Sequence, residues 1–263
     1  MRKNYFFGKY YKFIAADGYT FAVISSFADD GRALQLITPG RAYVLQDTSS
    51  VKIGKDTVVF RVNEQGLSFV GKIRMSDFHP LKYDAMGPFK PFAMECSHSV
   101  YSMYHDTQGE IEVNGERHSY AGGCGYIEGD RGRSFPQKYF WYNSVGKDYG
   151  VTVAIATIPF GLVNFEGILG FVSYRGKEYR LCTYNFAKVL KKTKNTVVIK
   201  RGEYILKIRV EGEGGHDLKA PSEGNMTRLI KENVSVATSF TFRRGGEVIL
   251  QRSDPHSSLE QMF

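Results

Sequence analysis

The chain has 263 residues, of which 42% are hydrophobic and 14% aromatic, and it carries a formal net charge of +8. This length is enough for one large β domain or two smaller ones, and the apolar fraction is ample for a packed core. The basic charge is scattered, apart from a short run at residues 191–194 in a predicted hairpin turn, so nucleic acid is not expected as a partner.

The cysteines do not indicate disulfides or metal. Cys96, Cys124 and Cys182 are too few, and odd in number, for a disulfide framework. Cys96 and His98 form a C-x-H pattern that lacks a second pair at zinc spacing. We therefore expect reduced thiols, no metal and a cytoplasmic location. No apolar segment follows the N-terminal charges, so no signal peptide is predicted, and residues 151–172 are too interrupted by polar residues for a membrane helix.

Short runs of β-branched and aromatic residues, separated by turn residues, recur along the chain. The predicted strands are Tyr19–Phe27, Thr57–Val62, Leu67–Met75, Glu110–Val113, Val151–Ile158, Ile168–Tyr174, Lys177–Thr183, Thr196–Lys200, Tyr204–Val210, Val234–Arg243 and Glu247–Gln251. Asn114-Gly115 is the strongest hairpin signal, because a type I′ turn needs positive φ at both central residues. A short helix is predicted only near Met226–Leu229. The fold class is therefore all-β, with serial hairpins typical of antiparallel barrels or sandwiches.

The two halves of the chain resemble each other. Four segments recur in the second half: Lys9–Phe13 as Lys138–Tyr142, Tyr19–Val23 as Tyr149–Val153, Thr57–Val59 as Thr196–Val198, and Lys72–Arg74 as Lys207–Arg209. These matches predict a duplicated β unit, with domains at residues 1–122 and 123–263. Each unit suits a barrel of about eight strands, which can hold one small apolar ligand inside.

Residues 125–143 contain an unusual mixture of charged and large aromatic residues. Acids, arginines and a lysine lie among aromatics that include the single tryptophan. The pattern is Tyr126-x-Glu128-x-Asp130-x-Gly132-x-x-Phe135-Pro136-x-Lys138-x-x-Trp141. It resembles the signature of the tocopherol cyclase family. Further similar segments are Met86-Gly87-Pro88-Phe89, Met94-Glu95-Cys96-x-His98, Leu218-x-Ala220-Pro221 and Gly224-x-Met226.

The resemblance covers nearly the whole chain and implies two fused lipocalin-like (calycin) antiparallel barrels, with carotenoid 1,2-hydratases as distant relatives. It also implies acid-initiated closure of a chromanol ring: a double bond of a prenylated quinol is protonated, and the phenol oxygen adds to the cation without a cofactor. Arg131 and Asp130 depart from the plant pattern, which usually has Trp and Asn there. These departures affect the prediction of the substrate more than the prediction of the fold.

Such chemistry needs a carboxyl group that stays protonated in a dry pocket, aromatic faces that stabilise a cation, and exclusion of water. Candidate catalytic residues are Glu128, Asp130 and His98, and candidate ligand-binding residues are Tyr126, Phe135, Tyr139 and Trp141. Strand alternation places Glu128 and Asp130 on one face, with Ile127 on the other.

Each candidate also has a structural alternative. The two acids could instead form ion pairs with Arg131, Arg133 and Lys138 that stabilise the junction between the two units. The aromatics could be ordinary core, and His98, beside Glu95, could be a hydrogen-bonded structural residue.

Two functional hypotheses follow. The protein is either an enzyme that cyclises or hydrates a prenylated, hydrophobic small molecule, or a carrier that binds such a molecule unchanged. A third, a structural protein, would have no cavity. No cofactor is expected; peripheral membrane contact and the oligomeric state are left open.

Overall fold

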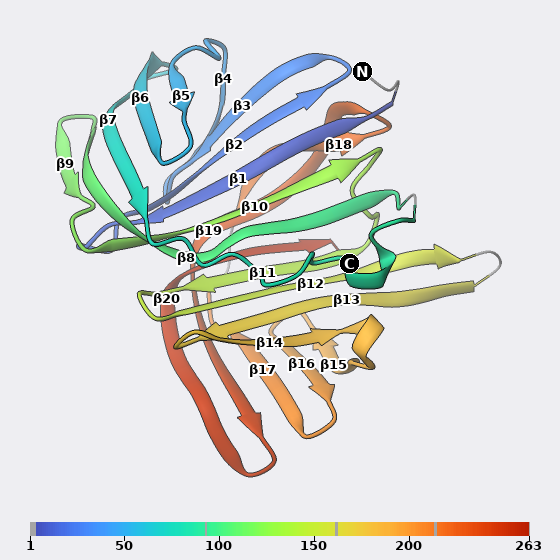
Figure 1. Cartoon of the computed structure of the whole chain (residues 1–263). Coiled ribbons are helices and arrows are strands. Elements are labelled where there is room, and N and C mark those ends of the chain that lie inside the picture. Colours follow the sequence, from blue (N-terminus) through green and yellow to red (C-terminus); the bar gives the residue numbers. More distant parts are fainter. Residues whose placement is uncertain (1–3, 93, 161–162, 213–214, 263) are drawn as a thin grey trace.

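The computed structural model describes residues 4–92, 94–160, 163–212 and 215–262 (Figure 1). These residues form two antiparallel sheets of ten strands each and two short 3-10 helices. The predicted all-β class with an internal duplication is therefore confirmed.

The first sheet contains β1 (Phe6–Ile14), β2 (Thr20–Ala28), β3 (Gly31–Ile37), β4 (Ala42–Leu45), β5 (Val51–Ile53), β6 (Thr57–Glu64), β7 (Leu67–Ser76), β8 (Cys96–Val113), β9 (Glu116–Ser119) and β10 (Gly123–Gly132). The second contains β11 (Tyr139–Val145), β12 (Tyr149–Phe160), β13 (Val163–Tyr174), β14 (Lys177–Cys182), β15 (Lys188–Thr193), β16 (Thr196–Arg201), β17 (Tyr204–Val210), β18 (His216–Ser222), β19 (Asn225–Arg244) and β20 (Glu247–Met262). The 3-10 helices are η1 (Gly87–Phe89) and η2 (Thr183–Asn185).

The two sheets share one topology. Their strand orders are β4-β3-β2-β1-β10-β8-β7-β6-β5 and β14-β13-β12-β11-β20-β19-β17-β16-β15. All four repeated sequence segments fall at or within equivalent strands: β1 and β11, β2 and β12, β6 and β16, β7 and β17. The chain passes from the first sheet to the second between Gly132 and Tyr139, so β10 belongs to the first sheet although it lies beyond the predicted domain boundary at residue 122.

Turn chemistry explains the serial hairpins. Asn114 and Gly115 have φ values of 51° and 90° and join β8 to β9, as a type I′ turn requires.

The helix predicted near Met226–Leu229 is wrong, because these residues begin the long strand β19. There the side chains alternate between buried and exposed, as they do in a strand with one face packed on a core.

Each sheet curves round its own apolar core, and both cores are filled. Phe13, Phe21, Phe60 and Phe69 are fully buried inside the first sheet. Phe140, Val151, Ile155 and Phe242 are among the equivalent residues inside the second. The expected ligand cavity inside a barrel is therefore wrong for this chain, since large side chains occupy both interiors.

The third apolar cluster lies between the two sheets and draws on both halves of the chain. At one end the sheets touch, because Gly150 of β12 brings its backbone against that of Met103 of β8. At the other end the facing residues are small, and a cavity opens between the sheets. The small residues that line it include Gly8, Gly129, Ala154, Ala156 and Gly167.

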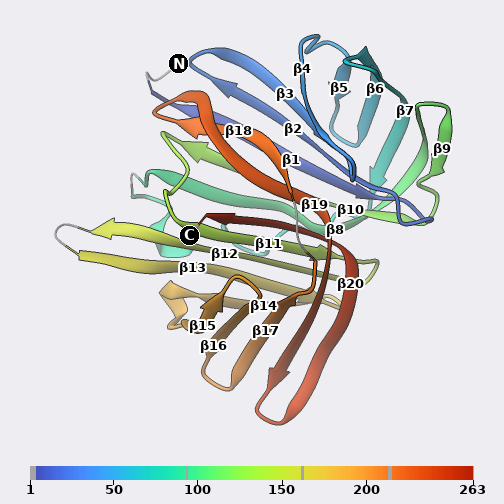
Figure 2. The same cartoon turned by 180° about the vertical axis from the view of Figure 1, so that it is seen from behind.

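Two connections at equivalent positions cross between the halves (Figures 1 and 2). The segment between β7 and β8 packs on β14, where Arg180 donates to the carbonyl oxygens of Tyr83 and Asp84. The β18–β19 hairpin packs on β2 and β3, where the Gln35 side chain exchanges two hydrogen bonds with the Lys219 backbone. The two crossing segments close the sides of the cavity.

The described part of the chain contains no helix that is long and apolar enough to cross a membrane. Cys96, Cys124 and Cys182 are free thiols. The cytoplasmic location, the membrane contact and the absence of a nucleic-acid partner stay predictions.

The close approach at Gly150 gives a test of the packing between sheets. A Cβ atom there would lie 2.1 Å from the Met103 carbonyl oxygen, so Gly150→Ala must push the sheets apart. We expect a loss of about 1–3 kcal/mol in the free energy of unfolding, measured by urea denaturation. Gly40→Ala is the matched control, because a Cβ there meets nothing within 4 Å. Equal stability of the two variants would contradict the described interface.

Candidate functional site

The cavity between the sheets has a volume of about 920 Å³ and a largely apolar lining. It is walled by β1, β2, β8 and β10 of the first sheet and by β11, β12, β13 and β20 of the second. Met86, Phe89 and Phe92 enter from one crossing segment, and Leu218 and Pro221 from the other. A cavity is therefore present, between the sheets rather than inside a barrel, and the hypothesis of a structural protein stays untested.

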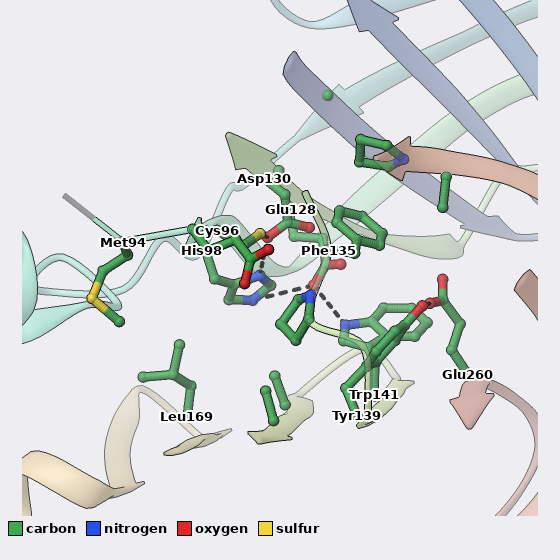
Figure 3. Close-up of a pocket in the computed structure, with 18 of the residues that line it drawn as sticks. Met94, Cys96, His98, Glu128, Asp130, Phe135, Tyr139, Trp141, Leu169 and Glu260 are labelled. Atoms are coloured by element: carbon green, nitrogen blue, oxygen red, sulfur yellow. Dashed lines mark hydrogen bonds and ion pairs between the residues drawn. The ribbon is translucent and has the colours of Figure 1, made fainter. Parts of the chain in front are cut away.

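Strand register brings the three candidate catalytic residues together. His98 of β8 and Asp130 of β10 are directly opposite partners, and Glu128 lies one same-face position away along β10. The His98 ring lies between the two carboxylates, with Nδ1 3.0 Å from Asp130 Oδ1 and Nε2 3.5 Å from Glu128 Oε2 (Figure 3). Ile127 points into the core of the first sheet, as the predicted alternation requires.

Glu128 is held by two further donors. The Tyr126 hydroxyl donates to Glu128 Oε2 at 2.5 Å, and the Trp141 indole Nε1 donates to the same oxygen at 3.1 Å. Trp141 belongs to β11 of the second sheet, so this contact joins the two halves of the chain. The fixed donors occupy Oε2 and leave Oε1 as the oxygen that can carry a transferable proton.

Burial and charge set the protonation of this cluster. Burial raises the pKa of Glu128 to about 7, because desolvation disfavours the carboxylate more than the nearby His98 imidazolium favours it. Burial alone would lower the pKa of His98, but the charges of Glu128 and Asp130 outweigh it and raise the pKa to about 9. At neutral pH the cluster therefore holds a charged imidazolium beside a carboxyl group that is poised to gain or lose a proton.

The alternative of an ion-pair network with the neighbouring basic residues does not match this geometry. Among the described residues, the ion-pair partner of both Glu128 and Asp130 is His98. Within the described chain neither acid forms an ion pair with the three basic residues considered, namely Arg131, Arg133 and Lys138. His98 likewise pairs with these acids rather than with Glu95.

The candidate ligand-binding aromatics divide into two groups. Phe135, Tyr139 and Trp141 line the cavity, whereas Tyr126 lies behind Glu128 and contacts it through its hydroxyl. Tyr10, which the sequence did not indicate, packs edge-on against Trp141 with ring centroids 5.3 Å apart. The cavity wall beside Glu128 is therefore built from aromatic rings of both sheets.

Glu260 and Glu232 are the acidic residues that sequence reasoning missed. Glu260 lines the cavity from β20, and Glu232 is its fully buried register partner on β19. One signal was available: Glu232 falls in phase with Ile230, Val234 and Val236 along an alternating strand, at a position where an apolar residue is expected.

Among the residues that the structure describes, these three also form the group with the spacing to hold a metal ion. The nearest ligand atoms of His98, Glu128 and Asp130 all lie within 4.8 Å of one another. Each imidazole nitrogen already faces a carboxylate, and a metal-bound imidazole must be neutral at the ligating nitrogen. This arrangement fits a proton better than a metal, and the expected absence of a metal stays a prediction.

No protein-family model and no curated protein matches the sequence. Solved structures do match the fold. Kievitone hydratase from Nectria haematococca is 10% identical with a TM-score of 0.56, over 97% of this chain and 88% of that one. CghA, solved with Sch210972, is 9% identical with a TM-score of 0.63, over 98% and 88%. A Nitrosomonas europaea protein described as an AttH candidate is 11% identical with a TM-score of 0.53, over 98% and 92%. At these identities the likeness shows a shared fold.

The coupling between Glu128 and His98 is testable by titration. The protonated His98 ring stabilises the fold below about pH 6.5, and this stabilisation is lost as the pH rises toward 9, because the folded-state pKa lies above the ordinary value. Glu128→Gln removes one of the two raising charges, so we expect the pKa of His98 to fall by at least about one unit. NMR titration of the His98 imidazole measures this fall in pKa, with the half-buried His216 ring, whose Nε2 contacts the Pro39 carbonyl oxygen, as control. An unchanged His98 midpoint contradicts the coupling.

Proposed function

We propose that this protein is an acid–base enzyme that adds an oxygen nucleophile across a carbon–carbon double bond of a large apolar substrate. The observation that carries the proposal is Glu128, a buried carboxyl group with a raised pKa that opens onto an apolar cavity. General acids are tuned in this way, since a protonated carboxyl near neutral pH needs a dry site.

In the proposed reaction Glu128 Oε1 transfers its proton to one alkene carbon and leaves a tertiary cation on the other. The face of Trp141, with Tyr10 and Phe135 nearby, stabilises that cation. A hydroxyl group of the substrate, or water, then forms the new C–O bond and loses its proton. The His98 imidazolium, held by Asp130, stabilises the Glu128 carboxylate that remains.

The substrate class we propose is a prenylated phenol or quinol, and the reaction is tocopherol cyclase-like ring closure. The support is the sequence pattern from Tyr126 to Trp141, whose residues meet at one site. A cavity of about 920 Å³ accommodates a ligand of this size. A solved structure with the same fold is named as a hydratase, so hydration is the related alternative within the same chemistry.

A carrier function is the second candidate. It is favoured by the size and the apolar lining of the cavity, which suit storage of a hydrophobic ligand as well as catalysis. The two functions differ in what they require of Glu128. Catalysis needs its proton, whereas binding needs only the shape of its side chain.

The Glu128→Gln variant separates these candidates. We expect it to bind a prenylated quinol with unchanged affinity, measured by quenching of Trp141 fluorescence, and to lose at least about 100-fold in turnover. Cyclisation is detected as a chromatographic shift at unchanged mass, and hydration as the gain of one water. Glu247→Gln, an exposed position on β20, is the control. Full turnover in Glu128→Gln would contradict its role as the acid, and binding without product in the wild type would establish the carrier.

A further inference from the structure

A second pair of acidic side chains lies between the sheets. Glu232 of β19 and Glu260 of β20 are directly opposite register partners, so their side chains project from the same face of the second sheet. Glu232 is 0% exposed and Glu260 is 9% exposed. Two buried carboxylates directly opposite each other would repel strongly, and the arrangement is stable only if a proton is shared between them.

In the part of the chain that the structure describes, no lysine or arginine donates a hydrogen bond to either carboxyl group of the pair. The Tyr139 hydroxyl donates to Glu260 Oε2 at 2.5 Å, whereas neither side-chain oxygen of Glu232 has a partner in hydrogen-bond geometry within the described chain, although the Tyr10 hydroxyl is close enough to lower the pKa of Glu232. Arg228 lies nearby, but its guanidinium donates to the backbone carbonyl oxygens of residues 135–137. A proton on Glu232 that is donated to Glu260 satisfies both carboxyl groups at once.

The pair lies on strands equivalent to those that carry the Glu128 cluster, because β19 and β20 are the topological equivalents of β8 and β10. The register positions differ, since Tyr10 is opposite Glu128 whereas its repeat equivalent, Tyr139, is opposite Met262. Each half therefore carries buried ionisable groups on these two strands, and Glu128 and Glu260 both line the shared cavity.

Trp141 separates the two sites. Its indole nitrogen donates to Glu128, and its backbone is the register partner of Glu260 on the neighbouring strand. Figure 3 shows Glu260 beside Tyr139 and Trp141, with His98 and Asp130 on the far side of the indole. A ligand lying along the Trp141 face thus meets one carboxyl site at each edge of the ring.

We propose that the Glu232–Glu260 pair is a second proton-exchanging site of this cavity, which takes up the proton released when the substrate oxygen adds to the cation. This inference rests on the proposed function and assigns Glu260 as the base that complements the acid Glu128. The pair would select a substrate whose hydroxyl group reaches the cation carbon from the Glu260 side while Glu128 protonates the neighbouring alkene carbon, as in a prenylated phenol folded for ring closure.

The protons balance over one turnover. The Glu128 proton forms the new C–H bond as the π bond breaks, and the hydroxyl proton passes to Glu260 as the C–O bond forms. The pair then holds two protons, and Glu128 is a carboxylate. Exchange with water after product release removes one proton from the pair and returns one to Glu128.

The electrostatic surroundings agree with this assignment. Burial raises the pKa of Glu260 to about 7, against the hydrogen bonds from Tyr139 and Glu232 that lower it. Burial, and then the charge of Glu260, raise the pKa of Glu232 well above its ordinary value. The other charged or titratable groups that act on the pair are Tyr10, Glu128, Asp130 and Arg228.

The first test needs no substrate. NMR of protein labelled with ¹³C at the glutamate carboxyl carbons follows each carboxyl group from pH 4 to 9. We expect one carboxyl of the pair to remain protonated at pH 7 and the other to titrate near pH 7. Glu232→Gln and Glu260→Gln should each abolish this shared titration, and Glu247→Gln should leave it intact. Titration of both residues in the ordinary range for glutamate, between about 4 and 5, would overturn the proposal.

The second test uses turnover of the prenylated quinol. The base must be ionised and the acid protonated, so we expect a bell-shaped pH profile of kcat centred near pH 7. Glu260→Gln should lower kcat by at least about 100-fold. Its residual kcat should depend less on pH on the acidic side of the optimum. Tyr139→Phe should shift that limb to higher pH, because it removes a hydrogen bond that lowers the pKa of Glu260.

The outcomes separate the two proposals. If Glu128→Gln is inactive while Glu260→Gln and Tyr139→Phe keep the wild-type rate and pH profile, the pair is structural and the proposed function stands. If folded wild-type protein turns over neither prenylated quinols nor prenylated phenols, the proposed function fails and the role of Glu260 as a base fails with it. Circular dichroism and binding of the quinol confirm that each variant is folded.

Discussion

Burial of carboxyl groups between two apolar sheets is the constraint on which this structure depends. A carboxylate that leaves water must find an opposite charge, accept hydrogen bonds or take up a proton. Glu128 uses all three, through His98, two fixed donors and a pKa raised to about 7. Glu232 and Glu260 meet the same demand by facing each other. The way the sheets pack therefore places carboxyl groups with pKa values raised to about 7 beside the cavity.

The shape of the interface explains why these acids open onto a cavity. The sheets touch near Gly150 and Met103, where backbones meet directly. Farther along the strands the facing residues shrink to Ala154, Ala156 and Gly167, so the space between the sheets is left unfilled. The equivalent crossing segments of the two halves then close its sides. Large side chains are packed inside both sheets, and the cavity lies at the interface between them.

Duplication gives this interface its approximate symmetry, and sequence divergence gives it two different acidic sites. The strand pairs β8–β10 and β19–β20 are equivalent, yet one carries a histidine between two carboxylates and the other two facing carboxyl groups. Residues 125–143 contribute to both sheets because β10 ends the first and β11 begins the second. This position explains why one short segment supplies Glu128, Asp130, Tyr139 and Trp141.

The sequence by itself determined the all-β class, the repeat and most turns, since alternation and turn chemistry are local properties. It also singled out Glu128, Asp130 and Trp141, because unlike residue types cluster along residues 125–143, and it singled out His98 in the separate segment 94–98. It did not place the cavity between the sheets, and it did not pair Glu232 with Glu260, which lie far apart in the chain. Strand register and the packing of two curved sheets decide those contacts. Both depend on residues from several strands at once, so no single segment of the sequence predicts them.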